Sequence, residues 1–324
     1  MRMYADSTVL KESNENSNDT ELRQRFDEDG YLFFRNIIDL KKVNQTRSDV
    51  LDVLCRFGLI EENENNEPIW SGKVLADLID VQTAIYALES YEQLRQCNEI
   101  MTIMERLWGA PVYSWKLVPV RTQPPKAGTP TPAHQDYQLF FRGGRFSVGW
   151  IPLMDIDESV GGIELIPASH KIFSETDYAL LEGRFLTGRA YSQVAAEKAV
   201  LLPQIPPEKV GGFVRTNYQL GDLLVLHDMV VHRSLPNVSK KFRLSMDTRF
   251  QPQDSHIPWY AKMTDCEYDG YSRRSEDALL EAGATQEEMQ RIFWKIFYFE
   301  GTEITPTRVR AELRRYNPPL FGAF

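Results

Sequence analysis

The chain has 324 residues, of which 42% are hydrophobic and 11% aromatic, so it can bury a sizeable core. Its formal net charge of -9 argues against nucleic acid or an anionic membrane surface as the main partner. The three cysteines, Cys55, Cys97 and Cys266, lie in no metal-ligand spacing, which fits a reduced compartment better than a disulfide scaffold.

Residues 1–18 are polar and rich in Ser, Asn and Glu, and we expect a flexible tail there. The N-terminus has no apolar signal segment, and no run of about 18 apolar residues occurs. We therefore expect a cytoplasmic protein without a transmembrane helix.

Residues 19–110 are expected to be mostly helical. Apolar spacing predicts helices over 40–59 and 81–108, and Asp19 or Thr20 is expected to cap a shorter helix that Gly30 ends. A strand is predicted over 31–34. No residue in this part of the chain suggests chemistry.

Residues 111–255 are expected to form a β core, and residues 256–324 a C-terminal helical region, so that 19–324 is a single domain. Strand patterns with turn signals between them occur over 112–121, 146–153, 163–166, 223–232 and 242–250. Several β segments between helical regions favour an antiparallel barrel or sandwich over a βαβ sheet. An insertion over 171–212 is interpreted equally well as a lid over a pocket and as an inert surface loop.

His134 and Asp136 lie two residues apart, so in an extended segment both side chains point to one face. Together with a third ligand from a distant strand they would form the arrangement of two histidines and one carboxylate. That arrangement leaves positions open on Fe(II) for a co-substrate and oxygen. The pair alone is weak evidence, because such a spacing is common by chance.

The distant ligand has two candidates, His227 and His232. They lie five residues apart, so on one regular strand they face opposite ways and only one reaches the metal. We favour His232, which is followed by Ser234 on the same face and by the turn residues Leu235 and Pro236. A bulge in the strand would reopen the question, and otherwise His227 is a hydrogen-bonded wall residue.

The segment 242–250 alternates clearly, with Arg243, Ser245, Asp247 and Arg249 on its polar face. A buried guanidinium needs a partner, and a carboxylate of a 2-oxo dicarboxylic acid that chelates iron would be a natural one. We expect this segment to be the hairpin partner of the His232 strand. The alternative is a structural ion pair between Arg243 and Asp247.

Four stretches, FDEDGYLFFRN, AHQD, GGIELIPASHK and GDLLVLHDMVVHRSLPN followed by FR, resemble the phytanoyl-CoA dioxygenase family of Fe(II)/2-oxoglutarate oxygenases. The resemblance covers roughly residues 20–250. It implies a double-stranded β-helix, a jelly-roll or cupin-like fold with flanking helical layers, which agrees with the strand pattern.

The resemblance implies that iron is bound by His134, Asp136 and His232. It assigns the distal carboxylate of 2-oxoglutarate to Arg243 and Ser234. Gln135 and Trp150 match positions that line the co-substrate or substrate pocket in such enzymes. His170, in the IPASHK turn, is interpreted as structural.

The resemblance also implies the reaction. Oxidative decarboxylation of 2-oxoglutarate with O2 gives succinate and CO2 and is coupled to oxidation of an unactivated C–H bond. Relatives that halogenate carry a small residue in place of the carboxylate, so Asp136 favours hydroxylation.

The substrate is expected to be a small polar or amphipathic compound, such as a specialised metabolite or an amino-acid-like molecule. No basic cluster suited to the phosphate groups of coenzyme A is present. Candidate pocket residues, drawn from the polar strand face and the aromatics near the ligands, are Tyr137, Phe141, Ser245, Asp247 and Arg249. Two alternatives remain open at this point: a jelly-roll protein that binds metal without turnover, and a zinc hydrolase that uses the same three ligands.

Overall fold

The computed structural model describes residues 9–61, 65–75, 79–116, 118, 120–125, 131, 133–136, 145–171, 212–257 and 262. The expected insertion lies outside these residues apart from its two ends. Nearly all of the expected C-terminal helical region lies outside them as well.

Five helices precede the β core in the described part of the chain: α1 (Asp19–Asp29), α2 (Leu40–Arg56), α3 (Ile79–Tyr86), α4 (Glu89–Arg95) and α5 (Asn98–Trp108). Asn18, rather than Asp19 or Thr20, caps α1 through a capping box with Glu21. The prediction of one helix over 81–108 is wrong. The backbone is extended at Leu88 and Cys97, and neither break carries a glycine or proline that would signal it.

The described part of the segment 1–18, where a flexible tail is expected, makes specific contacts with the rest of the chain. Leu10 is 4% exposed and Val9 forms a parallel bridge with Arg215. The backbone N–H of Ser13 donates to the carbonyl of Phe33. This segment therefore lies along β1 (Tyr31–Phe34) and covers part of a sheet edge that would otherwise be unpaired.

The large sheet is antiparallel and has the order β1-β6-β4-β8-β2, with β3 also paired to β8. Its further members are β2 (Val112–Ser114), β3 (Val120–Gln123), β4 (Ser147–Pro152), β6 (Leu223–His227) and β8 (Arg243–Pro252). The segment predicted over 112–121 is two strands, which pair with opposite ends of β8.

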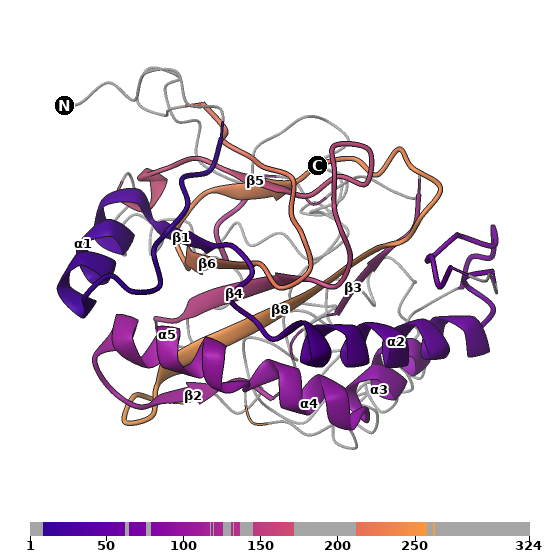
Figure 1. Ribbon diagram of the computed structural model, residues 1–324, viewed down its shortest axis with the longest axis horizontal. Coiled ribbons are helices and arrows are strands. Elements are labelled where there is room, and N and C mark those ends of the chain that lie inside the picture. The colour runs from indigo at the N-terminus through magenta and orange to yellow at the C-terminus, as the bar shows by residue number, and fades with distance from the viewer. Residues whose placement is uncertain are drawn as a thin grey trace, which may run out of the picture.

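Cross-strand partners carry their side chains on the same face, so the register divides the sheet into two sides. Helix α5 covers one side, where a Cβ on Gly149 would lie 3.2 Å from the Met104 side chain. Figure 1 shows the helices α2, α4 and α5 along this side of the sheet. The polar face of β8 lies on the other side, with Trp150 of β4 opposite Asp247.

A second, smaller sheet pairs β5 (Ile163–Leu165) with β7 (His232–Ser234), on the side of the large sheet away from the helices (Figure 1). Bridges from His134 to His232 and from Leu165 to Val214 extend it. Two antiparallel sheets that enclose a polar interior are the expected double-stranded β-helix. The jelly-roll prediction is confirmed.

Two expectations about strand pairing are wrong. The segment 223–232 is two strands, because the chain turns at Asp228 and the N–H of Val230 donates to the carbonyl of His227. Consequently β7 belongs to the small sheet and pairs with β5, whereas β8 pairs with β4. Arg243 and His232 therefore reach the interior from different sheets rather than from one hairpin.

Among the residues described, no helix is long and apolar enough to span a membrane.

Candidate metal centre

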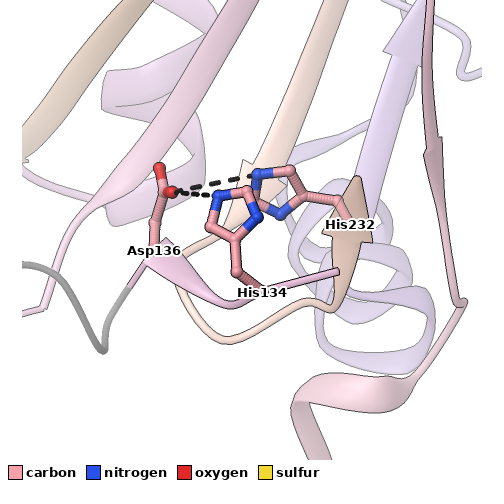
Figure 2. A group of neighbouring side chains, drawn as sticks. All are labelled: His134, Asp136 and His232. Carbon is pink, nitrogen blue, oxygen red and sulfur yellow. Dashed lines mark hydrogen bonds and ion pairs between the residues drawn. The ribbon is translucent and has the colours of Figure 1, made fainter. Parts of the chain in front are cut away.

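Three buried side chains, those of His134, Asp136 and His232, converge inside the β core (Figure 2). Asp136 Oδ1 lies 3.2 Å from His134 Nε2 and 3.8 Å from His232 Nε2. All three ligand atoms lie within 4.8 Å of one another. One carboxylate and two imidazoles in this arrangement are the donor set of mononuclear iron sites with open positions.

The backbone fixes this arrangement. His134 and His232 exchange two backbone hydrogen bonds of 3.0 Å, so two segments distant in sequence are locked side by side. Gln135 points away from the cluster, and its amide donates to the carbonyl of Met229 in the turn before β7. The alternation that places His134 and Asp136 on one face is therefore anchored from the opposite face.

Hydrogen bonding also fixes the tautomer of His232. Its Nδ1 lies 3.1 Å from the carbonyl of Val230, which can only accept, so Nδ1 carries the proton. Nε2 is left with a lone pair that faces Asp136. A histidine ligand oriented by a backbone carbonyl in this way is typical of metal sites.

The electrostatics of the cluster favour a charged carboxylate and a neutral imidazole. Burial disfavours the charged form of Asp136, but the hydrogen bond from His134 and the charge of Arg249 outweigh it and hold its pKa well below the usual range. Burial, followed by the proximity of His134, lowers the pKa of His232 to about 4. Both groups are in the protonation state that a metal ligand requires.

His227 lies outside this cluster. Its Nε2 lies 3.0 Å from Arg145 Nη2, and its ring packs 4.6 Å from that of His170 and 5.6 Å from that of Phe26. His170 donates from Nε2 to the carbonyl of Asp27, and burial lowers its pKa to about 4. Both histidines connect α1 to the β core, in agreement with the structural interpretation of His170.

Arg243 is buried on the interior face of β8 and is 3% exposed. Its Nη1 donates to the carbonyl of Gly161 at 3.0 Å, whereas its buried Nε has no hydrogen-bond partner. Burial, followed by the charge of Arg121, lowers its pKa to about 10. Among the residues that the structure describes, no carboxylate forms an ion pair with it.

The alternative pairing of Arg243 with Asp247 does not occur. Asp247 instead accepts two hydrogen bonds, of 2.7 and 3.0 Å, from Arg121 on β3. The hydroxyl of Ser245, between Arg243 and Asp247 on this face, is buried without a partner. Arg121 is not among the site residues predicted from the sequence. Its place in the predicted strand over 112–121 is the signal that the sequence offers.

Arg249 and Trp150 share the same interior side. Arg249 lies 3.4 Å from Asp136 Oδ2 through its Nη2, so it contacts a proposed metal ligand rather than open space. Trp150 is 1% exposed and packs edge-on against Tyr218 at 4.6 Å. Ser234 is buried on β7, two residues beyond His232, and its side chain lies on the same side of that strand.

The two remaining pocket predictions, Tyr137 and Phe141, lie outside the described residues. A feature missed from the sequence is Gly161, whose carbonyl accepts from Arg243. Its φ of +79° and the backbone oxygen of Pro236, 2.4 Å from an added Cβ, leave room only for glycine. Gly161 begins the GGIELIPASHK stretch, but its contact with Arg243 depends on the tertiary structure and has no signal in the sequence.

Comparison with known proteins agrees with this geometry. The sequence matches the family described as phytanoyl-CoA dioxygenase (PhyH) over residues 26–245. It is 28% identical over 275 residues to 1-deoxypentalenic acid 11-beta-hydroxylase of Streptomyces arenae, covering 79% of this chain and 89% of the relative. It is 24% identical to peroxisomal phytanoyl-CoA dioxygenase of Bos taurus, covering 73% and 69% of the two chains.

A solved structure with a similar fold is that of SnoN, described as a non-heme alpha ketoglutarate dependent epimerase from nogalamycin biosynthesis. The TM-score is 0.51 at 21% sequence identity, and the match covers 72% of this chain and 83% of that one. At this identity the likeness supports the fold.

Proposed function

This chain belongs to the phytanoyl-CoA dioxygenase family of non-haem iron, 2-oxoglutarate-dependent oxygenases, and we propose that it hydroxylates an unactivated C–H bond of a small metabolite. Succinate and CO2 would be the co-products. The proposal is supported by the three converging donors, by the arginine opposite them and by the family match over 26–245.

His134, Asp136 and His232 would hold the iron through two imidazole nitrogens and one carboxylate oxygen. Three protein ligands on one side leave room for 2-oxoglutarate and O2 on the other, and the bound metal supplies the redox chemistry. The contribution of the chain is to keep Nε2 of His232 unprotonated, to keep Asp136 charged and to enclose the reacting atoms between two sheets.

The proposal that 2-oxoglutarate is the co-substrate rests on Arg243. A guanidinium buried without a carboxylate partner is costly, and a bound dicarboxylate would supply the missing charge and accept from the unpartnered Nε. Ser234 on the facing strand is the proposed second donor to that carboxylate. Trp150 would form an apolar wall of the same space, since it lies on the interior side of β4.

The proposed substrate is a small, mostly apolar or amphipathic compound of specialised metabolism. The Streptomyces relative is named as a 1-deoxypentalenic acid 11-beta-hydroxylase, which supports hydroxylation of a small molecule. Ser245, Asp247 and Arg249 line the polar side of the interior, although Asp247 and Arg249 already have ionic partners there. The family name alone does not indicate a coenzyme A thioester.

The test is an anaerobic titration of the Fe(II)-loaded protein with 2-oxoglutarate, followed by the visible charge-transfer band of the chelate. We expect the band in the wild type. In Arg243→Met the concentration of 2-oxoglutarate for half-saturation should rise at least about tenfold, because a charge-assisted, paired hydrogen bond is lost.

Arg233→Met is the matched control. Arg233 lies next to His232 but points outward to Glu164, with 43% of its side chain exposed, so its loss should leave the titration unchanged. Absence of the band in the wild type would contradict the oxygenase assignment and favour a zinc hydrolase or a binding protein. An equal effect of the two substitutions would contradict the role of Arg243.

A further inference from the structure

The two oxygens of Asp136 have different neighbours. Oδ1 faces Nε2 of both histidines, at 3.2 and 3.8 Å, whereas Oδ2 faces Nη2 of Arg249 at 3.4 Å. All of these side chains are buried, with Arg249 only 3% exposed. The carboxylate is therefore held between a histidine side and an arginine side.

Arg249 is itself fixed in place. Its backbone carbonyl accepts from the N–H of Trp115 at 2.9 Å, and its guanidinium carbon lies 5.8 Å from the centre of the Trp115 ring. The Trp115 indole in turn donates to the side chain of Gln251 at 2.8 Å. A buried guanidinium that packs beside a ring has few orientations open to it, and the Nη2 of Arg249 is directed toward Asp136.

We propose that Arg249 is a positioning residue for the metal centre, which holds Oδ2 so that Asp136 coordinates through Oδ1 alone. The inference rests on the proposed function, because it assumes that His134, Asp136 and His232 bind the metal. A carboxylate that binds through one oxygen occupies one coordination position, which leaves the others for 2-oxoglutarate and O2. Arg249 thereby acts on the reaction through Asp136 rather than through the substrate.

A positioning role and a simple charge effect predict opposite changes in metal affinity when Arg249 is replaced. A cation near a divalent metal repels it, so removal of the Arg249 charge would strengthen metal binding if charge alone mattered. If Arg249 orients the ligand, its removal weakens binding, since the partners that orient metal ligands typically contribute 10- to 100-fold in affinity. The direction of the change therefore separates the two effects.

The experiment measures anaerobic binding of Co(II) and Fe(II) to the full chain, without 2-oxoglutarate, together with the ligand-field spectrum of the Co(II) form. For Arg249→Met we expect the metal dissociation constant to rise about 10- to 100-fold and the Co(II) spectrum to change as Asp136 coordinates through both oxygens. Arg249→Lys should recover part of the affinity, because an ammonium still donates one hydrogen bond to Oδ2.

Arg243→Met is the matched control, since Arg243 is also 3% exposed on the same face of β8 but does not contact Asp136. It should keep the metal affinity of the wild type while losing affinity for 2-oxoglutarate. Thermal unfolding of the metal-free variants shows whether they are folded, and Arg249→Lys and Arg249→Gln replace Arg249→Met if that variant is not.

The outcomes are distinct for the two proposals. Unchanged or tighter metal binding in folded Arg249 variants, with an unaltered Co(II) spectrum, would overturn the positioning role. Failure of the wild type itself to bind Fe(II) or Co(II) would instead overturn the metal centre on which the inference rests.

Discussion

His227 and His232 show how neighbouring histidines of one sequence motif acquire different roles. His232 begins β7 and faces Asp136, with its Nδ1 proton directed to a backbone carbonyl. His227 ends β6 and faces Arg145 and His170 on the outer side of the turn. The four residues between them move the chain from one sheet to the other.

Substitution of the two histidines should separate these roles. We expect His232→Ala to weaken Fe(II) or Co(II) binding by more than about 100-fold, since loss of a ligand exceeds the usual effect of its supporting partners. His227→Asn should change metal affinity by less than about threefold but lower the thermal midpoint, because it removes the contacts of a half-buried ring with His170 and Phe26. Isothermal titration calorimetry and thermal unfolding measure the two quantities, and a reversed order of metal affinities would assign the distant ligand to His227.

The sequence was sufficient to predict the pair His134 and Asp136 and to favour His232, but the reason given for His232 was partly wrong. Strand parity assumed one strand over 223–232, whereas the chain turns at the buried carboxylate of Asp228, which accepts from Arg145 at 2.7 Å. The alternation of β8 did predict the interior face correctly. The partners of Asp247 and Arg249 could not be predicted, because both contacts join segments more than 100 residues apart.

At the scale of elements, the junction between α1 and β1 determines how the helical part meets the β core. Gly30 caps α1 with a φ of 78°, and a Cβ there would lie 2.4 Å from Nδ1 of His170. The sequence indicated the glycine cap. It gave no signal that His170, 140 positions further along, packs directly on that glycine.

Gly30→Ala should therefore destabilise the protein by about 2–4 kcal/mol, through a left-handed backbone conformation and a clash with a buried ring. Gly72→Ala is the matched control. Gly72 has a φ of +87° but no neighbour within 4 Å of an added Cβ, so only the backbone cost of about 1 kcal/mol applies. Urea unfolding measures both free energies, and equal losses would show that the contact with His170 contributes nothing.

At the scale of the whole molecule, two buried histidines couple folding to pH. The pKa values of His170 and His232 are both lowered to about 4, chiefly by burial. An unfolded chain takes up these protons at its ordinary pKa near 6.5, before the folded chain does. The contribution of these two histidines to the free energy of unfolding is therefore fully present above about pH 6.5. It is progressively lost as the pH falls toward 4.

For the metal-free protein we expect the free energy of unfolding to decrease over this window. His170 alone should account for up to roughly 3 kcal/mol. In His170→Gln, which keeps a donor for the carbonyl of Asp27, the decrease between pH 7 and pH 4.5 should be smaller. Urea unfolding at the two pH values provides the comparison, and parallel pH profiles of wild type and variant would contradict the contribution of His170.

If this β-helix encloses a centre for oxidative decarboxylation, one oxygen atom of O2 enters the succinate that it forms. The most direct test supplies the Fe(II)-loaded protein with 2-oxoglutarate under 18O2 and measures the mass of the succinate formed. We predict succinate that carries one oxygen atom from 18O2 in the wild type and none above background in His232→Ala. Unlabelled succinate, or no succinate with either protein across a panel of small-molecule substrates, would contradict oxidative decarboxylation at this centre.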